Sequence, residues 1–339
     1  MNTSGASLRA TGTSGLTKLI CPTLILLSAC SPSTRAQRVT LPPGASFSAV
    51  TDSLVAHSVI TSPRWFELLA RLRGVDRTVH AGVYQFPAGT TPWKALGMLA
   101  AGRSAAARFT SPEGLTIQEV ADLAKDRLGL PNDSFLVAAR DGDMATRMLG
   151  NRVSSFEGFL RPETYVVPVT ISARELVRIM AEGFRSAWKP SWDARLDSLK
   201  MDRVALVTLA SIVEGEARAD EERETIAGVY TNRLRIGMAL QADPTIQYAI
   251  SLKTGKRKPR LFVKDYMIKS PYNTYLNPGL PPGPVNSPGR RSIEAALYPA
   301  NVKYLYFVAG PNGRHIFSRT YNEHLRAVRR VRESAKRKP

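Results

Sequence analysis

The chain has 339 residues, of which 43% are hydrophobic and 22% are charged. This composition is that of an ordinary folded protein and excludes a wholly disordered chain. The 47 Lys and Arg residues outnumber the 28 Asp and Glu residues, which gives a formal net charge of +19. Such a surface attracts polyanions, which include nucleic acid, anionic lipid and anionic cell-wall polymer.

The first 30 residues predict a bacterial export signal. Arg9 and Lys18 precede a mostly apolar run, Leu19 to Leu27. This run is too short to cross a membrane core of about 30 Å, which takes about 20 residues. The run ends in "LSAC", which resembles a lipobox, so we expect a lipid on Cys30. An uncleaved membrane anchor is the alternative.

An export signal places the folded part of the chain outside the cytoplasm, where nucleic acid is not an expected partner. Residues 31–38 are mostly small and polar, as expected of a tether to a cell membrane. We expect this tether to attach the folded part of the chain to the inner membrane. Cys21 and Cys30 both lie at or before the lipobox, so the mature fold needs no disulfide.

Three segments share one pattern in which Pro, Gly and a hydroxyl residue alternate before a helical apolar pattern. They are Pro42, Gly44 and Ser46; Pro87, Gly89 and Thr91; and Pro112, Gly114 and Thr116. Each predicts a strand, a tight turn and a capped helix. Similar spacing within so short a stretch indicates duplicated small α/β units like LysM modules over residues 39–128. The alternative is that common helix caps recur by accident.

Residues 204–213 are apolar on almost every side and predict a buried helix. Glu214 continues one face of this helix, while Glu216 points elsewhere. Desolvation and the negative end of the helix both favour the protonated form of Glu214, as a general acid requires. The alternatives are exposure to solvent or an ion pair with an arginine such as Arg218 or Arg223.

The chain after this helix carries side chains suited to sugars. Gln241, Asn273 and Tyr275 are candidates for hydrogen bonding or stacking, although each is also a common structural residue. Residues 277–289 hold five prolines and three glycines, which excludes a helix or a central strand. Residues 303–320 predict a hairpin followed by a helix. The four histidines show no close ligand pairing, so no metal site is expected.

Several motifs resemble the endolytic murein transglycosylase (YceG-like) family. They are "EGFLRPETY", "LASIVEGEA", "VYTNRLRIGMALQADPTIQYAI", "SPYNTYLNPGLPPGPVNSPG", "ALYPANVKYLYFVA" and "GRHIFSRTYNEH", in family order. The resemblance implies an anchored enzyme that cuts nascent peptidoglycan strands between N-acetylmuramic acid and N-acetylglucosamine and leaves a 1,6-anhydro end. It puts the family's catalytic glutamate at Glu214 and implies no cofactor. It also implies a possible peptidoglycan synthase partner.

The expected fold is α+β. After the LysM-like part we expect a connecting helical region over residues 129–200, a catalytic domain with a buried catalytic helix over 201–330, and a basic tail over 331–339. Arg161, Glu163, Gly215 and Ala217 depart from the residues usual in the family. Two other functions stay open, a muramidase that uses water and a non-catalytic lipoprotein that binds peptidoglycan.

Overall fold

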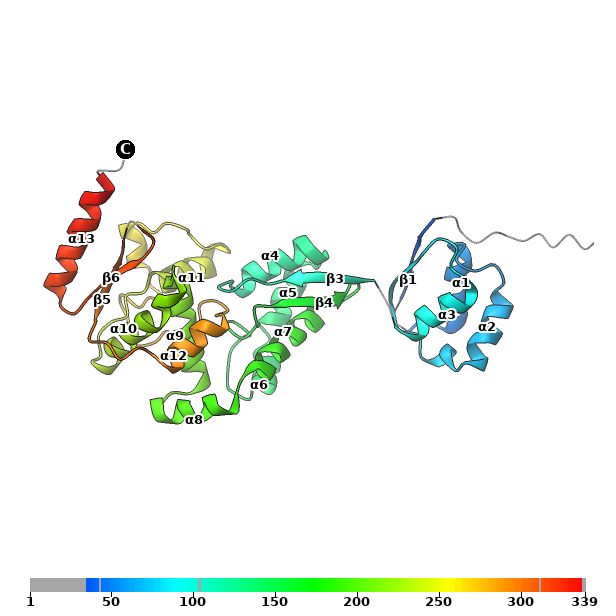
Figure 1. Cartoon of the computed structure of the whole chain (residues 1–339), viewed down its shortest axis with the longest axis horizontal. Coiled ribbons are helices and arrows are strands. Elements are labelled where there is room, and N and C mark those ends of the chain that lie inside the picture. The colour runs from blue at the N-terminus through cyan, green and yellow to red at the C-terminus, as the bar shows by residue number, and fades with distance from the viewer. Residues whose placement is uncertain (1–34, 43, 103–104, 311, 337–339) are drawn as a thin grey trace, which may run out of the picture.

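The computed structural model describes residues 35–42, 44–102, 105–310 and 312–336. The export signal and Cys30 therefore lie outside the described residues. Within the described part, no helix has the length and apolar character needed to span a membrane. Figure 1 shows a smaller unit that ends near residue 102 and a larger unit that begins near residue 105.

The smaller unit folds as strand, two helices, strand and a final helix. Its elements are β1 (Gln37–Leu41), α1 (Phe47–Ala56), α2 (Pro63–Leu72), η1 (Val75–Arg77), β2 (Gly82–Phe86) and α3 (Pro92–Ala100). β1 and β2 pair antiparallel, with Val39 opposite Tyr84. The helices pack on this pair around a hydrophobic cluster between Val39 and Leu99.

The predicted repeat of strand, turn and capped helix is confirmed in all three copies. Ser46, Thr91 and Thr116 each accept a hydrogen bond from the backbone N–H three residues on, at 3.2, 3.3 and 3.3 Å. These bonds satisfy amides that the first helical turn leaves unpaired. The glycine before each cap has a positive φ, which side chains other than glycine rarely adopt.

The third copy belongs to the larger unit. Its strand β3 (Ala106–Thr110) pairs antiparallel with β4 (Thr164–Pro168), and its helix α4 (Ile117–Leu128) packs against α5 (Asn132–Ala139). One hydrophobic cluster runs from Phe109 to Leu297. The boundary expected at residue 128, at the end of the LysM-like part, therefore falls inside a single hydrophobic core. The reason is that β4, after this boundary, pairs with β3, before it.

The larger unit is mainly helical, with two small antiparallel sheets, so the α+β class is confirmed. Its remaining elements are α6 (Gly142–Leu149), α7 (Ala173–Ala187), α8 (Pro190–Leu199), α9 (Arg203–Glu216), η2 (Asp220–Glu222), α10 (Arg223–Arg235), α11 (Asp243–Thr254), η3 (Val263–Met267), α12 (Arg290–Leu297), β5 (Tyr306–Ala309), β6 (His315–Ser318) and α13 (Tyr321–Lys336). The predicted hairpin is the β5–β6 pair. The expected basic tail continues α13 as far as Lys336.

Helix α9 is the buried helix that the apolar pattern predicts. Every residue from Leu206 to Val213 is buried. The helix packs against α8, α10, α11 and α12. The Asp202 carboxylate caps its first turn by accepting a hydrogen bond from the Ala205 N–H at 2.7 Å.

The proline-rich loop before α12 has no regular secondary structure, as expected, and is fixed to α9. The Val285 N–H donates to the Ser211 hydroxyl at 3.0 Å, and the Asn286 amide donates to the Ser211 carbonyl at 2.9 Å. The Pro284 ring also packs directly on Gly158. A Cβ atom at position 158 would lie 2.3 Å from this ring, so only glycine leaves room for it. This loop therefore joins α9 to the segment that precedes β4.

Candidate functional site

Glu214 lies in a buried polar network on the α12 side of α9. Its side chain is 8% exposed, and its Oε1 lies 3.2 Å from Nη1 of Arg223, whose side chain is 11% exposed. The other oxygen, Oε2, accepts hydrogen bonds from the Gly289 N–H at 3.0 Å and the Ser292 hydroxyl at 2.8 Å. Of the arrangements considered from the sequence, the structure contains the ion pair with Arg223.

These contacts correct the expected environment of Glu214. The sequence places the carboxyl at the negative end of α9, but in the fold it also faces the positive N-terminus of α12. The Gly289 N–H, the Ser292 hydroxyl and the Arg223 guanidinium together engage both oxygens of the carboxyl. Because both oxygens already have partners within the protein, this environment suits a structural carboxylate.

Glu216 lines a polar cavity of about 350 Å³ that Glu214 does not line. The side chains around it include Tyr230, Gln241, Asp243, Tyr275 and His315. They come from α10, the start of α11, the loops beside it and strand β6. Glu216 is partly exposed into this space. The cavity brings together residues from Gly215 to His315, far apart in the sequence, around the carboxyl groups of Glu216 and Asp243.

Burial raises the pKa of Glu216 from an ordinary value of 4.5 to about 7, and the negative charge of Asp243 acts in the same direction. The Tyr230 hydroxyl, which donates to Oε1 at 2.9 Å, lowers the pKa, as does the charge of Arg233. Desolvation raises the pKa by more than the Tyr230 hydrogen bond and the Arg233 charge lower it. Near neutral pH the carboxyl therefore exists in both its protonated and its ionised forms.

Gln241 and Tyr275, two of the side chains expected to bind sugar, both line the Glu216 cavity. Gln241 has a φ of +49°, a left-handed conformation that is strained for a residue with a side chain. Its N–H donates to the Thr274 carbonyl at 3.1 Å. The Tyr275 hydroxyl donates to Oδ1 of Asp243 at 2.7 Å, so both residues have fixed positions at the cavity wall.

Asn273 does not line the cavity, which corrects its expected place as a sugar ligand. Its side chain is fully buried. The amide nitrogen donates to the carbonyls of Tyr266 and Ile268 at 2.9 and 2.8 Å, and the amide oxygen accepts from the Tyr275 N–H at 2.9 Å. Asn273 therefore holds the loop that carries Tyr275.

Three side chains of the site carry no functional signal in the sequence pattern. Glu216 lies off the helix face that continues to Glu214, so periodicity does not select it. Tyr230 contacts Glu216 only because α10 packs along α9. His315 approaches the cavity because its backbone N–H and ring Nδ1 contact the Glu222 carboxylate at 2.8 and 2.7 Å. These contacts join segments that show no pattern in common.

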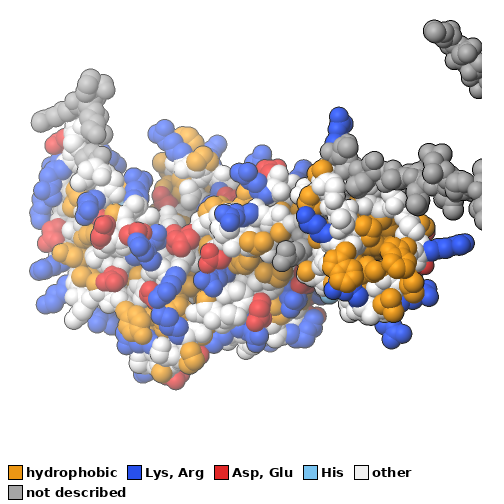
Figure 2. All heavy atoms as spheres, turned by 45° about the vertical axis from the view of Figure 1, so that its right-hand side comes forward, with side chains coloured by type: hydrophobic (Ala, Val, Ile, Leu, Met, Phe, Trp, Pro, Cys, Tyr) orange, Lys and Arg blue, Asp and Glu red, His pale blue; other side chains and the backbone are white. Residues whose placement is uncertain are grey.

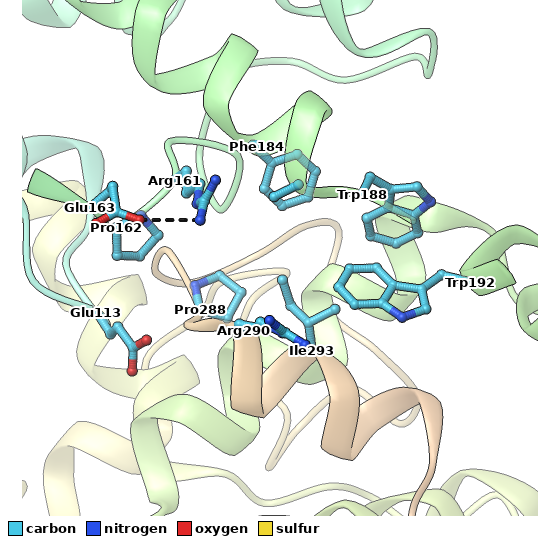
Figure 3. Close-up of a pocket in the computed structure, with 11 residues that line it drawn as sticks. Glu113, Arg161, Pro162, Glu163, Phe184, Trp188, Trp192, Pro288, Arg290 and Ile293 are labelled. Atoms are coloured by element: carbon cyan, nitrogen blue, oxygen red, sulfur yellow. Dashed lines mark hydrogen bonds and ion pairs between the residues drawn. The ribbon is translucent and has the colours of Figure 1, made fainter. Parts of the chain in front are cut away.

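A second cavity of about 270 Å³ lies beside the N-terminus of α12 (Figure 3). Phe184, Trp188 and Trp192 form one side of it, and Arg161 and Glu163 form an ion pair of 3.1 Å at its edge. Glu113 also lines it, and burial raises the pKa of this carboxyl, followed by the charge of Glu214. This cavity shares no lining residue with the Glu216 cavity.

Metal binding has no candidate within the part of the chain that the structure describes. No group of three His, Cys, Asp or Glu side chains there could hold an ion. The side chains around the Glu216 cavity supply carboxyl, hydroxyl, amide, imidazole and guanidinium groups. The carboxyl groups suit proton transfer to or from a polar substrate.

Comparison with known proteins now identifies the family. The model of the YceG-like family matches residues 39–330. The chain belongs to the YceG-like family. An endolytic murein transglycosylase of Bacillus subtilis is 33% identical over 305 residues, which cover 85% of this chain and 83% of that protein.

Other members of the family agree with this match. An endolytic murein transglycosylase of Streptococcus pneumoniae is 30% identical over 66% of this chain, which spans 44% of that longer protein. A crystal structure of a yceG-like protein from Listeria monocytogenes is 31% identical, has a TM-score of 0.60, and matches 87% of this chain and all of that one. The YceG-like fold thus extends over both units.

Gly215 lies between the two glutamates at the end of α9. A Cβ at this position would lie 2.6 Å from Cγ of Pro244, at the start of α11. A proline ring cannot rotate away as a flexible side chain would. The glycine therefore lets α11 approach the end of α9, which brings Asp243 close to Glu216.

We expect Glu214→Gln to lower the free energy of unfolding by about 2 kcal/mol, because the buried Arg223 guanidinium then keeps only Asp220 as a counter-charge. Glu216→Gln should change it by less than about 1 kcal/mol, because the amide can still accept the Tyr230 hydrogen bond. Urea denaturation at neutral pH measures both. Equal losses in the two variants would contradict the different environments described for these glutamates.

Proposed function

We propose that the chain is an endolytic murein transglycosylase. Its membership of the YceG-like family and its 33% identity to a protein of that name support this function. The substrate is then the glycan strand of peptidoglycan. The enzyme cleaves within the strand, between N-acetylmuramic acid and N-acetylglucosamine, and leaves a 1,6-anhydro end. Cleavage of nascent strands would end their elongation.

Glu216 is the proton donor in this proposal, in place of the Glu214 predicted from the sequence. The observation that carries it is a carboxyl with a pKa of about 7 in a polar cavity that Gln241 and Tyr275 also line. Such a pKa suits an acid that must hold a proton at neutral pH and release it in the reaction. The role of Glu214 is then structural. It pairs with Arg223 and accepts the hydrogen bond of the Gly289 N–H at the start of α12.

The reaction needs only one carboxyl group. Protonated Glu216 gives its proton to the glycosidic oxygen, and the bond from that oxygen to C1 breaks as positive charge develops on the sugar ring. The Glu216 carboxylate then takes the proton of the sugar's own 6-hydroxyl, whose oxygen forms the new bond to C1. No water is consumed, and the intramolecular hydroxyl gains from proximity. Gln241 and Tyr275 orient the sugars.

The smaller unit is a LysM-like module that holds the glycan strand. Its order of strand, two helices and strand supports this assignment. Trp65 on α2 and Trp93 on α3 are 57% and 56% exposed, and the Arg73 guanidinium lies 3.7 Å from the centre of the Trp93 ring. Figure 2 shows hydrophobic side chains gathered on this unit. Exposed aromatic rings can stack on sugar rings.

The chain acts outside the cytoplasm in this proposal, where its substrate lies. Residues 1–30 direct export and provide the anchor, either through a lipid on Cys30 or as an uncleaved membrane segment. The tether is shorter than the expected residues 31–38, because strand β1 begins at Gln37. The inner membrane places the enzyme beside nascent strands and a peptidoglycan synthase. In the larger unit, residues 129–200 support the catalytic region 201–330.

We expect the wild-type chain to release 1,6-anhydro-ended fragments from uncrosslinked glycan strands, as identified by mass spectrometry. Glu216→Gln should lower the rate by roughly 10²- to 10⁴-fold, the usual contribution of a general acid. Glu214→Gln is the matched control, and its folded fraction should stay active. Loss of activity in folded Glu214→Gln but not in Glu216→Gln would restore Glu214 as the acid.

The products separate this function from the alternatives. Reducing-ended fragments would identify a muramidase that uses water. An unreactive chain that still binds glycan would identify a binding lipoprotein.

The activity should depend on pH through Glu216. Because the acid must be protonated, kcat/KM should be highest at low pH, reach half its maximum near pH 7, and fall about tenfold for each further pH unit.

Tyr230→Phe removes a hydrogen bond that lowers the pKa of Glu216, so the alkaline limb of the kcat/KM profile should move to higher pH. A limb that stays in place would contradict the link between Tyr230 and the acid.

Trp93→Ala should weaken retention of the chain on insoluble peptidoglycan by roughly fivefold, because it removes an aromatic surface worth about 1 kcal/mol. A pull-down assay with purified cell walls measures the bound fraction. Val137→Ala is the control, since Val137 is 73% exposed on α5 in the other unit. Unchanged retention in Trp93→Ala would remove this ring from the proposed glycan surface.

A further inference from the structure

The segment between α11 and α12 exposes large apolar side chains. Phe262, Val263 and Met267 are 52%, 86% and 69% exposed, and Val263 is the most exposed large hydrophobic side chain in the part of the chain that the structure describes. The segment is yellow in Figure 1, at the edge of the larger unit. Neighbouring apolar side chains left in water mark an interaction surface.

The same segment is strongly basic. Residues 253–269 contain seven Lys and Arg residues and one acid, Asp265. Two of the cations have acidic partners, since Arg257 pairs with Glu119 and Lys258 pairs with Asp265, each at 2.7 Å. The other five side chains are exposed, and no ion pair holds them among the described residues: Lys253, Lys256, Arg260, Lys264 and Lys269.

Hydrogen bonds fix the backbone of this segment against the rest of the larger unit. The Gln247 amide donates to the Lys258 carbonyl at 3.0 Å, and the Asn273 amide donates to the Tyr266 and Ile268 carbonyls. The Phe262 N–H donates to Asp265 at 2.6 Å. The apolar side chains are therefore held outward by a defined loop, which lowers the entropy lost when they bind.

We propose that residues 252–269 bind the surface of an anionic phospholipid membrane. Phe262 and Val263 enter the headgroup region, and the five unpaired cations contact lipid phosphates. Pro259, in the same segment, lines the Glu216 cavity. Binding through this segment would therefore hold the cavity beside the membrane, as a contact separate from any N-terminal anchor.

Charge favours a membrane over a protein partner for this segment. The buried centres of protein interfaces are depleted in charged residues, lysine above all. Apolar side chains flanked by several Lys and Arg residues are instead typical of segments that lie in the interface of an anionic membrane. Each cation near such a surface contributes about 1 kcal/mol, and burial of the Phe262 and Val263 side chains adds to this attraction.

The test uses residues 35–339, because the buried residues of both hydrophobic clusters lie between Val39 and Leu297. Residues 35–339 contain no cysteine, so the Val263→Cys variant can carry a single environment-sensitive fluorophore. Val137→Cys on α5 is the matched control, at a side chain that is 73% exposed. The probes are phosphatidylcholine vesicles with and without phosphatidylglycerol.

We expect the fluorophore at position 263 to shift to shorter wavelength with the anionic vesicles alone, while the one at position 137 does not shift. Phe262→Asp combined with Val263→Asp should weaken vesicle co-sedimentation by about tenfold or more, as expected when two apolar contacts are lost and two negative charges are added. Both positions are exposed, and unchanged thermal unfolding would verify that the fold is intact.

Three results would overturn the proposal. One is no shift at position 263, or an equal shift at position 137. Another is vesicle binding that the double aspartate variant does not weaken, which would assign membrane contact to a different basic surface such as α13. The third is concentration-dependent self-association that the double variant abolishes, which would make a second copy of the chain the occupant. None of these readouts depends on catalysis.

Discussion

A carboxylate at the end of a buried apolar helix must find a counter-charge, and the ion pair between Glu214 and Arg223 meets this requirement. The pair joins α9 to the start of α10, and the second Glu214 oxygen binds the start of α12. Three helices are therefore fixed at one carboxylate. Because α9 is held on this side, Glu216, two residues on, lies in the cavity formed with α10 and α11.

Close packing at glycines completes this arrangement. Gly215 admits Pro244 against the end of α9, and Gly158 admits Pro284 from the proline-rich loop. A side chain at either position would separate the segments that it now joins. The same loop bonds to Ser211 on α9, so direct contacts join the elements around the two glutamates. Such contacts favour the preorganisation that a proton donor requires.

The charge and the exposed apolar groups of the chain fall on surfaces with different chemistry. The smaller unit presents tryptophans suited to sugar rings, the Glu216 cavity is polar, and residues 252–269 combine apolar side chains with unpaired cations. In the proposed function, one unit holds a glycan strand, the other cuts it, and residues 252–269 attach the enzyme to a membrane. The excess of Lys and Arg would then favour attachment to an anionic surface.

Local features of the sequence determined the elements of this protein. The three capped helices, the buried helix from residue 204 and the C-terminal hairpin follow from spacings within a few residues, which set backbone conformation directly. The motifs in family order also determined the family. Tertiary structure alone decided the environments of the two glutamates, because these depend on partners far along the chain. Arg223 and the start of α12 bind the two oxygens of Glu214, whereas burial and the charge of Asp243 raise the pKa of Glu216 in the cavity.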